Sequence, residues 1–417
     1  MPLSGFERRE NRLYCGDSPL DAIVAEVGTP CYVYSGDAIV AGYRAYADAL
    51  TETPHEVHFA VKANGSLGVL ALLAQAGAGF DIVSGGELYR VIQAGGDPSR
   101  VVFSGVGKTR AEMKYAIEAG IGAFHCESEP ELEALAEVAR ELDRSPSVAL
   151  RVNPDVNAET HPYIATGLSE HKFGVPIDAA EAIYRRAAEL APLRLEGVSC
   201  HIGSQIFDTA AFFEALDLVL GLVDRLRAAG VEIIKLDLGG GLGIAYRDGQ
   251  ETPSIGAFAA RLAEAIAGRG LKLMLEPGRS IVGQAGVLLT NVVYRKPAGS
   301  KVFVIVDAAM NDLIRPALYQ SHHEIVPVAL DETRPEIHAD IVGPICESGD
   351  FLARDRSMRD VKQGETLAVC TAGAYGFVLS SNYNARPRAA EVLVKGASRR
   401  VIREREGYED LIRGERA

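Results

Sequence analysis

Ionisable and polar residues recur in this chain wherever a short apolar run comes to an end. In order along the sequence these positions are Lys62, Asp81, Ser104, Glu127, Arg151 with Asn153, His201, Gly239–Gly241 and Glu276. If the runs are parallel strands of one barrel, their carboxyl ends meet at a single rim, where such barrels carry their active sites. A purely structural barrel does not need so many ionisable groups at one rim. We therefore expect these side chains to form one chemical site.

Lys62 directly follows the apolar run V-H-F-A-V. A lysine at a strand end either extends its ammonium group into solvent or is a buried amine. Burial lowers the pKa of an amine and makes it a good nucleophile for Schiff-base formation. Position alone leaves both interpretations open.

A glycine run, G-G-G-L-G at 239–243, follows the seventh apolar run. The loops after strands seven and eight of such barrels commonly hold a phosphate, which backbone N–H groups can surround when no side chain intervenes. The run does not match the dinucleotide pattern G-x-G-x-x-G. The alternative is a flexible turn.

Glu276 and His201 are candidates for contact with an aromatic cofactor. Glu276 lies in E-P-G-R, and a carboxylate facing a pyridine nitrogen keeps that nitrogen protonated, which makes the ring an electron sink. The alternative is a salt bridge between Glu276 and Arg279. His201, in C-H-I-G-S-Q, could stack on such a ring or be a hydrogen-bonded core residue.

Other candidates occur late in the chain. Cys346 and Glu347 lie in G-P-I-C-E-S-G-D, whose Gly-Asp turn indicates an exposed loop where a thiol could donate a proton. A lone cysteine is more often a small core residue. Arg315 and Tyr319, in R-P-A-L-Y, and Tyr375, in G-A-Y-G, also fall on expected turns.

The elements that must position these residues alternate between strand and helix. Eight β-branched runs are separated by alanine-rich amphipathic segments: 58–63, 79–83, 101–104, 123–126, 148–152, 197–202, 233–238 and 271–275. Thr109–Glu112 and Ser128–Glu131 have the spacing of capping boxes. Eight β–α units predict an α/β fold with a (β/α)₈ TIM-like barrel, and a doubly wound open sheet is the alternative.

Beyond Gln284 the pattern changes to strands without long helices between them. We expect strands at 287–294, 301–307, 325–330, 337–342, 366–371 and 390–394, in a mostly antiparallel β-barrel or sandwich domain. Residues 31–34 are also strand-like. The predicted organisation is a barrel over 36–284 and a discontinuous β domain of 1–35 and 285–417. Residues 155–177 are long for a barrel loop and typical of a lid.

Bulk properties exclude several classes of protein. The chain has 417 residues and a formal net charge of −13, which disfavours nucleic-acid binding. Its six cysteines form no C-x-x-C pair, so zinc is not expected and free thiols in a reducing compartment are. No signal-peptide or transmembrane run appears, and we expect a cytoplasmic protein that binds no membrane.

Taken together, the motifs resemble the fold-type III pyridoxal-phosphate decarboxylases, and within them the diaminopimelate decarboxylases of lysine biosynthesis. The matching segments cover nearly the whole chain: G-T-P-C-Y-V-Y-S (28–35), F-A-V-K-A-N (59–64), G-F-D-I-V-S-G-G-E (79–87), H-K-F-G (171–174), H-I-G-S-Q (201–205), G-G-G-L-G-I (239–244), E-P-G-R (276–279), R-P-A-L-Y (315–319) and C-E-S-G-D (346–350). Each is modest alone, but all in this order are specific.

The resemblance implies a role for each motif. Lys62 should carry pyridoxal 5'-phosphate as a Schiff base, with Asp81, His201, Ser204, Gly241, Glu276, Pro277, Gly278, Arg279 and Tyr375 also at the cofactor. Within that set, His201 should stack on the ring and Glu276 should pair with its nitrogen. The phosphate should lie at Ser204, Gly241 and Gly278, with Tyr375 closing over the cofactor. Cys346, the expected proton donor, and Glu347 should reach the site from the neighbouring subunit of a homodimer.

The substrate implied is meso-diaminopimelate, which has a carboxylate and an amine at its distal end. Arg279 and Arg315 offer planar forks for that carboxylate, Glu347 can take the ammonium, and Tyr319 and Tyr375 complete the substrate contacts. An ornithine site would instead set two arginines against a cationic tail. The alternatives left open are decarboxylation of lysine, ornithine or carboxynorspermidine, a racemase on the same barrel, and an inactive cofactor carrier.

Overall fold

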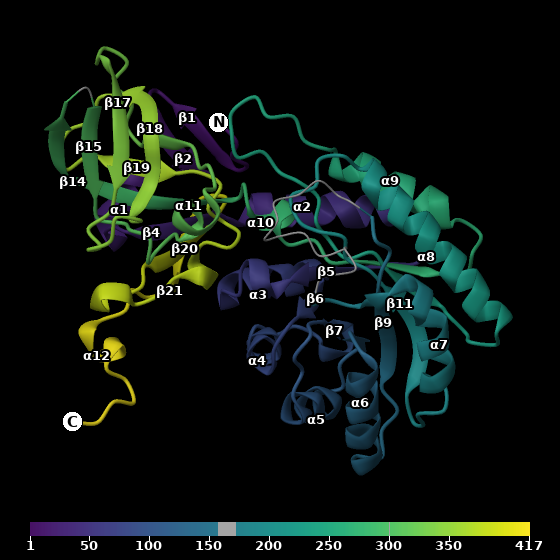
Figure 1. Cartoon of the computed structure of the whole chain (residues 1–417). Coiled ribbons are helices and arrows are strands. Elements are labelled where there is room, and N and C mark those ends of the chain that lie inside the picture. Colours follow the sequence, from purple (N-terminus) through teal and green to yellow (C-terminus); the bar gives the residue numbers. More distant parts are fainter. Residues whose placement is uncertain (157–171, 300) are drawn as a thin grey trace. The chain divides into compact units, whose positions relative to one another are not determined.

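The computed structural model describes residues 1–156, 172–299 and 301–417 (Figure 1). Two compact units make up the chain. The barrel unit comprises Gly42–Ile244 and Thr252–Ser280, and the β unit comprises Met1–Ala41, Ala245–Glu251 and Ile281–Ala417. Most of the expected lid segment, 157–171, lies outside the described residues.

Eight parallel strands close the barrel. They are β5 (His55–Ala60), β6 (Gly79–Ile82), β7 (Val101–Phe103), β8 (Ala123–Cys126), β9 (Ser147–Asn153), β11 (Arg194–Ser199), β12 (Lys235–Asp237) and β13 (Lys272–Leu275). The last strand returns to the first, with Leu273 of β13 opposite His55 of β5. A short strand, β10 (Val175–Pro176), pairs with β9 outside the ring. The predicted barrel is confirmed, and an open sheet is excluded by the β13–β5 pairing.

Helices follow the strands along the chain (Figure 1). They are α3 (Leu67–Ala76), α4 (Gly85–Gln93), α5 (Arg110–Ala119), α6 (Glu129–Glu141), α7 (Ile177–Ala187), α8 (Ala210–Ala228) and α9 (Ile255–Ile266). Thr109 and Glu112 form the predicted reciprocal box at the start of α5. At α6, Ser128 accepts from the Glu131 amide, but the Glu131 carboxylate accepts from the Glu127 amide, so the second expected box is a simple N-cap.

The first barrel strand ends earlier than its sequence suggests. We expected a strand over 58–63, but β5 ends at Ala60 and the chain then turns through a 3₁₀ helix, η2 (Val61–Ala63). The Asn64 amide closes this turn on the Val61 carbonyl at 3.0 Å. An apolar run does not by itself distinguish a strand from a buried turn. Lys62 therefore projects from a hydrogen-bonded turn rather than from the strand itself.

The β unit is a mixed, mostly antiparallel sheet. Its path runs β18 (Phe351–Arg359), β17 (Glu336–Val342), β15 (Lys301–Val306), β14 (Gly286–Ala298), β4 (Cys31–Ser35), β20 (Ala390–Lys395) and β21 (Ser398–Arg403). The strands β16 (Ile325–Pro327) and β19 (Thr366–Val369) branch from β14. As expected, β4 joins this sheet: it lies antiparallel to β14 and parallel to β20. Val33, Val287, Leu289 and Val392 share its buried core.

Sequence patterns missed the charged edges of this unit. Neither β18 (F-L-A-R-D-R-S-M-R) nor β21 (S-R-R-V-I-R) was expected, because arginines interrupt their apolar alternation and mark edge strands. The remaining unpredicted elements are β1 (Phe6–Arg9), β2 (Arg12–Cys15), β3 (Ser18–Pro19), α1 (Leu20–Val27), α2 (Gly36–Ala47), α10 (Arg279–Val282), α11 (Arg315–Tyr319) and α12 (Tyr408–Leu411), with 3₁₀ turns η1 (Asp48–Leu50), η3 (Pro98–Arg100), η4 (Phe377–Leu379) and η5 (Tyr383–Ala385).

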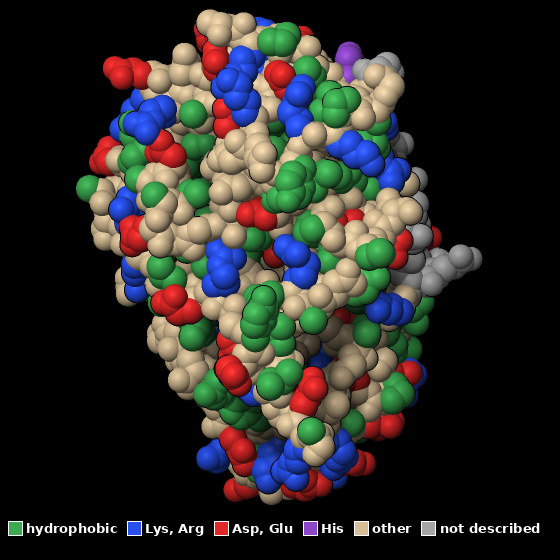
Figure 2. Space-filling model, turned by 90° about the vertical axis from the view of Figure 1, so that its left-hand side faces the viewer, with side chains coloured by type: hydrophobic (Ala, Val, Ile, Leu, Met, Phe, Trp, Pro, Cys, Tyr) green, Lys and Arg blue, Asp and Glu red, His purple; other side chains and the backbone are tan. Residues whose placement is uncertain are grey.

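Acidic and basic side chains are interspersed over the face drawn in Figure 2, without a large patch of one sign. All six cysteines are free thiols, as predicted, and only Cys346 is exposed. In the described residues, no helix combines the length and the apolar character that a membrane span requires.

Candidate active site

The carboxyl ends of the barrel strands surround a cavity of about 170 Å³. Its lining consists of Lys62, Val83, Ser104, Gly105, His125, Arg151, Phe173, Ser199, Cys200, His201 and Glu276. These residues come from turns and strand ends spread over more than two hundred positions of sequence. The structure thus brings together five of the rim residues expected from the sequence, because parallel strands end at the same rim.

Lys62 is held at this cavity by Asp81. The Lys62 Nζ lies 2.5 Å from Asp81 Oδ2, and the Asp81 side chain is fully buried while that of Lys62 is about one-third exposed. Burial and the charge of Glu276 raise the pKa of Asp81, and the Lys62 ammonium opposes that rise. The ion pair from β6 therefore orients the amine, and its exposed side leaves the amine accessible to a ligand.

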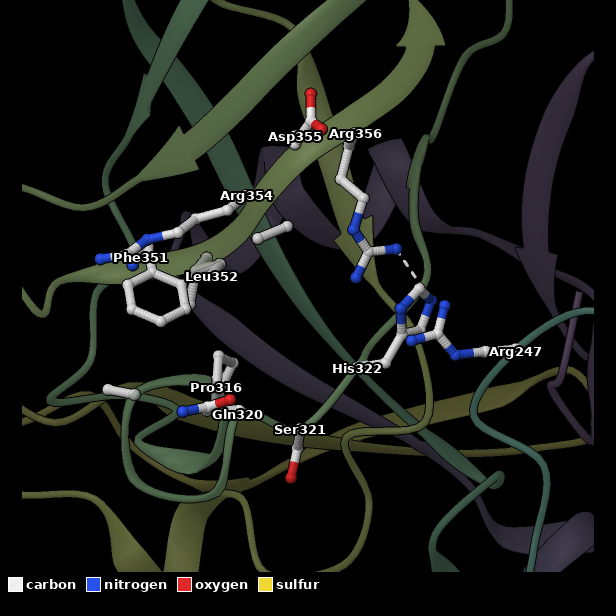
Figure 3. A pocket seen from close by; sticks show the side chains of 12 residues that line it. Arg247, Pro316, Gln320, Ser321, His322, Phe351, Leu352, Arg354, Asp355 and Arg356 are labelled. Carbon is white, nitrogen blue, oxygen red and sulfur yellow. Dashed lines mark hydrogen bonds between the residues drawn. The ribbon is translucent and has the colours of Figure 1, made fainter.

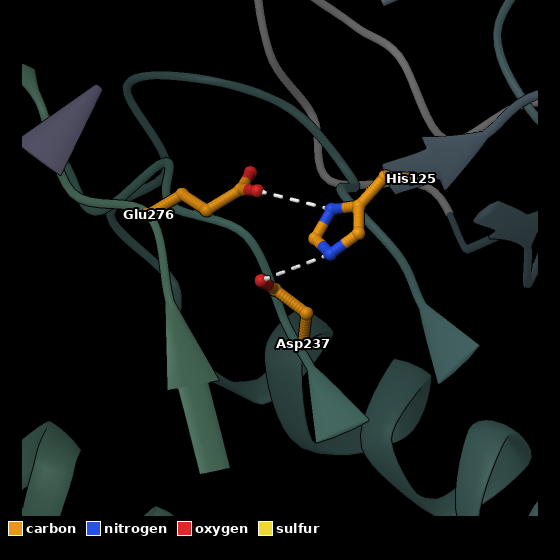
Figure 4. A group of neighbouring side chains, drawn as sticks. All are labelled: His125, Asp237 and Glu276. Atoms are coloured by element: carbon orange, nitrogen blue, oxygen red, sulfur yellow. Dashed lines mark ion pairs between the residues drawn. The ribbon is translucent and has the colours of Figure 1, made fainter. Parts of the chain in front are cut away.

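Glu276 also lines the cavity, and His125 beside it favours its charged form (Figure 4). The His125 Nδ1 is 3.3 Å from Glu276 Oε1, and its Nε2 is 3.8 Å from Asp237 Oδ2. Burial opposes charge on Glu276, but hydrogen bonding and the charge of His125 outweigh it and place the pKa of Glu276 far below its usual range. The pKa of His125 is raised by the two facing carboxyl groups despite its burial.

Asp237 is the carboxyl group near His125 whose protonated, neutral form is favoured. Burial and the charge of Glu276 raise its pKa to about 8, against the opposing effect of His125. Its other oxygen, Oδ1, accepts from the Gly239 amide at 2.7 Å. His125, Asp237 and Glu276 are residue types that bind metal ions, and one ligand atom from each lies within 4.8 Å of the others. The imidazolium already supplies the positive charge that Glu276 requires.

Sequence reasoning missed both His125 and Asp237. Each lies inside an apolar run, A-F-H-C and K-L-D-L, where it resembles an ordinary core position. The alternation of side chains along a barrel strand could have identified them. Residues two apart in a strand face the same side, so a polar residue in register with inward-facing neighbours points into the barrel interior.

His201 is a neutral ring at the end of β11. Burial, with the positive charges of Arg151 and Lys62, lowers the pKa of His201 to about 3. Its Nδ1 accepts from the Gly240 amide at 3.3 Å. An uncharged, oriented imidazole facing the cavity suits contact with a flat aromatic ligand.

The glycine run packs against the backbone of neighbouring strand ends. A Cβ on Gly240 would lie 2.3 Å from the Glu276 carbonyl oxygen, and one on Gly241 would lie 2.3 Å from the Gly203 carbonyl oxygen. Gly241 also has φ +116°, which L-residues rarely adopt. Asp237 and His201 take the amides of Gly239 and Gly240. The later part of the run is thus the part suited to a phosphate.

The E-P-G-R segment packs against the turn that carries Lys62. The Ala60 amide donates to the Pro277 carbonyl at 3.2 Å, and a Cβ on Gly278 would lie 2.9 Å from the Ala63 Cβ. Arg279 Nη2 donates to Ser204 Oγ at 3.1 Å. Two residues expected at the cofactor, Ser204 and Arg279, are therefore neighbours.

Several buried polar atoms in and beside the cavity have no hydrogen-bond partner among the described residues, which fits a polar aromatic cofactor. Arg151 is anchored through Nη1 to the buried Glu127 at 3.0 Å, but its Nε and Nη2 have no hydrogen-bond partner among the described residues. The same holds there for Ser199 Oγ and Asp81 Oδ1. Buried polar groups are normally satisfied, so this concentration at one cavity indicates a ligand.

The other predicted site residues belong to the β unit. Arg315 is buried, lies over the Tyr246 ring at 4.7 Å, and its Nη1 is 3.0 Å from His323 Nε2. Tyr319 ends the short helix α11 that Arg315 begins. Cys346 and Glu347 lie on an exposed loop, as expected. Tyr375 has a positive φ of 55° in a turn. Their roles at the barrel cavity remain predictions.

Comparisons with known proteins agree on one family. Residues 37–283 match the family model of the pyridoxal-dependent decarboxylase, pyridoxal binding domain. The diaminopimelate decarboxylase of Pseudomonas aeruginosa is 57% identical over 98% of each chain. That of Neisseria meningitidis serogroup A is 49% identical over 97% of this chain and 99% of its own.

Solved structures agree as well. The diaminopimelate decarboxylase of M. jannaschii in complex with L-lysine superposes with a TM-score of 0.94 at 37% identity, over 100% of this chain and 99% of the other. The Helicobacter pylori enzyme, also with L-lysine, gives 0.91 at 38% identity over 94% and 98%. The chain therefore belongs to the pyridoxal-dependent decarboxylases and, within them, to the diaminopimelate decarboxylase family.

Proposed function

We propose that this chain decarboxylates meso-2,6-diaminopimelate to L-lysine and CO₂, the last step of lysine biosynthesis, with pyridoxal 5'-phosphate bound at Lys62. The observation that carries the proposal is the arrangement of Lys62 and Glu276 at one cavity, with Glu276 held ionised by His125. The similarity of the whole chain to diaminopimelate decarboxylases, two of them solved with L-lysine, supports the substrate.

The bound cofactor supplies the electron sink that accepts the electrons released when the carboxylate leaves. The protein's contribution is to bind and orient it. Lys62 Nζ would bind it covalently, and the Glu276 carboxylate would keep its ring nitrogen protonated. The neutral His201 ring would contact its aromatic ring. Ser204, Gly241 and the Gly278 backbone would hold its phosphate.

Substrate recognition rests on charge complementarity. Arg279 and Arg315 are the proposed partners of the distal carboxylate, because a guanidinium can form two parallel hydrogen bonds with it. Glu347 takes the distal ammonium and Tyr319 adds a hydrogen bond. A substrate without the distal carboxylate would leave these arginines facing a cationic tail, at a cost of several kcal/mol.

Proton delivery completes the reaction. Cys346 would donate its thiol proton to the substrate Cα that has lost its carboxylate, and Lys62 would hold the cofactor between turnovers. We place Cys346 and Glu347 in the site of the neighbouring subunit of a homodimer. Their exposed loop, anchored by the Cys346 amide to Asn384 Oδ1 at 3.1 Å, is consistent with a contact made outside their own unit.

Borohydride reduction and peptide mapping test the cofactor assignment. The expected result is a pyridoxyl group on Lys62 and on no other lysine, absent in Lys62→Ala. Lys108 is the matched control, since its Nζ donates to the Gly105 and His125 carbonyls at the ends of other barrel strands but is buried against Glu131 at 2.6 Å. Adduct formation at Lys108 instead of Lys62 would refute the assignment.

Release of CO₂ from meso-diaminopimelate, compared with lysine, ornithine and carboxynorspermidine, tests the substrate. The proposal requires a clear preference for diaminopimelate, and exchange of the α-proton without CO₂ release would indicate a racemase instead.

The shared site has a separate test. Mixed and reassociated Lys62→Ala and Cys346→Ala subunits should regain about a quarter of the wild-type activity, because only mixed dimers contain one intact site. No regain would place both residues in one subunit's site.

A further inference from the structure

A second and larger cavity, of about 740 Å³, lies in the β unit beside α11 and β18 (Figure 3). It is lined by Arg247, Pro316, Ala317, Gln320, Ser321, His322 and the run Phe351–Arg356. None of these residues lines the barrel cavity, and none has a role in the proposed reaction. The cavity is built entirely within the β unit, so its lining does not depend on the barrel.

Cationic side chains dominate this cavity. Arg247, Arg354 and Arg356 line it, and Asp355 is its one acidic lining residue. The Asp355 carboxylate points away from His322 (Figure 3), is 86% exposed and lies 3.7 Å from His338 Nδ1. The lining therefore carries an excess of positive charge, in a chain whose net charge is −13.

The nearest carboxylate behind the lining, Glu324, is already in use. Its Oε1 lies 2.9 Å from His322 Nε2 and its Oε2 lies 3.7 Å from Arg356 Nη1, and the Asp248 backbone amide also donates to it. The same His322 Nε2 lies 2.8 Å from Arg356 Nη1. One ring nitrogen cannot accept from Arg356 and donate to Glu324 at once, so the protonation of His322 decides which of these two contacts forms.

Arg247 and Arg356 repel each other across this space. Burial lowers the pKa of Arg356; the charge of Glu324 opposes this effect and the smaller contribution of Arg247 adds to it. In the described part of the chain, the Arg247 side chain forms neither a hydrogen bond nor an ion pair. Glu324 is the one carboxylate near Arg356 among the described residues, and Arg247 has none within ion-pair distance there, so the net positive charge of the two guanidinium groups favours the entry of an anion.

The opposite wall is apolar, formed by Pro316, Ala317, Phe351, Leu352 and Ala353. A site with a cationic end and an apolar wall suits a small organic molecule that carries an oxyanion. We propose that this cavity is a second ligand site, which binds a small organic anion through a carboxylate or phosphate held by Arg247 and Arg356.

The short helix α11 carries both residues that line this cavity and residues that we propose to contact the substrate. Pro316, Ala317 and Gln320 line the cavity, while Arg315 and Tyr319 of the same short helix are the proposed substrate contacts. A ligand in the cavity would bridge α11 and β18 and so restrict the movement of α11. This consequence rests on the proposed function, whereas binding of the anion does not.

Calorimetric titration of the cofactor-loaded protein with inorganic phosphate and with citrate, at constant ionic strength, tests the site. We expect one saturable site per chain for at least one of the two probes. Arg247→Gln and Arg356→Gln should each weaken it about tenfold or more, because each removes a charge-assisted hydrogen bond. Arg400→Gln, at an exposed arginine of β21, is the matched control and should leave binding unchanged.

Phosphate and citrate distinguish the two chemistries of ligand, and a crystal soaked with the tighter probe should show it between Arg247 and Arg356. Arg247 is exposed, so its replacement is expected to fold even if the Arg356 variant does not. The absence of saturable binding, or equal binding by wild type and Arg247→Gln, would overturn the proposal. Repeating the titration on cofactor-free protein separates this outcome from failure of the proposed function, since binding to Arg247 should persist there.

Discussion

Replacing Gly240 with alanine tests whether the backbone contact between β12 and β13 sets the position of Glu276. The added Cβ would lie 2.3 Å from the Glu276 carbonyl oxygen and 2.9 Å from its carbonyl carbon, where real Cβ contacts stay above 3.0 Å. Both atoms belong to the backbone, so no side-chain rotation can relieve the clash. Because Gly240 has an ordinary negative φ, the expected effect is steric and not conformational.

The size of the effect follows from the geometry. The backbone at Glu276 must move by at least about 0.7 Å, and overpacking of this kind destabilises a protein by about 1–3 kcal/mol. A displacement approaching 1 Å at a reacting group can lower activity by about 10²-fold. We expect Gly240→Ala to lose between roughly tenfold and 10²-fold in kcat/KM and to bind the cofactor more weakly.

Gly221→Ala is the matched control. Gly221 lies inside α8, and a Cβ there would approach Arg225 Nη1 at an ordinary 3.7 Å. This change should stabilise the protein by about 0.5–1 kcal/mol, since alanine loses less backbone entropy in a helix. Denaturant unfolding, cofactor absorbance titration and CO₂ release measure the three quantities. The reasoning fails if Gly240→Ala retains cofactor affinity and kcat/KM within about twofold of wild type.

Further predictions concern charge, burial and reactivity. His125→Gln should raise the pKa of Glu276. Cofactor affinity requires ionised Glu276, so as the pH is lowered the variant should lose affinity at a higher pH than the wild type. Identical pH profiles in the absorbance titration would contradict this. Arg151→Ala leaves the buried Glu127 carboxylate without its ion-pair partner and should destabilise the protein by about 3–5 kcal/mol. Arg110→Ala breaks only exposed ion pairs and should leave the free energy of unfolding almost unchanged, and urea titration measures both variants. A thiol reagent should label Cys346 before any other cysteine, and bound substrate should slow that labelling, whereas rapid labelling of a second cysteine would contradict the burial of the others.

Much of the barrel was predictable because its strands repeat one simple pattern. Each apolar run ends in a polar residue, and eight such ends identify the rim without any knowledge of distances. The pattern could not place the end of β5, since V-K-A is as apolar as the strand before it and the turn depends on a hydrogen bond from Asn64. It also could not separate His125 and Asp237 from core positions, because their pairing with Glu276 joins three strands distant in sequence.

The β unit was less predictable for a related reason. Its inner strands, such as β14 and β20, carry long apolar runs because both faces are covered, and the sequence identifies them. Its outer strands are arginine-rich, so hydropathy does not detect them. The roles of Cys346 and Glu347 rest on family resemblance, since nothing in their exposed loop requires one particular chemistry.

The position of β4 between β14 and β20 sets an order of folding during synthesis. Cys31 of β4 pairs with Leu289 and with Ala390, so this strand leaves the ribosome long before either partner exists. All eight barrel strands are made in the interval, and they pair mainly with sequence neighbours. Closure of β13 on β5 then shortens the effective loop between β4 and β14, which lowers the entropy lost when they pair. Folding of the barrel thus brings β4 closer to the segments with which it later pairs. A chain truncated before β14 leaves β4 as an unpaired strand that chaperones and proteases can bind.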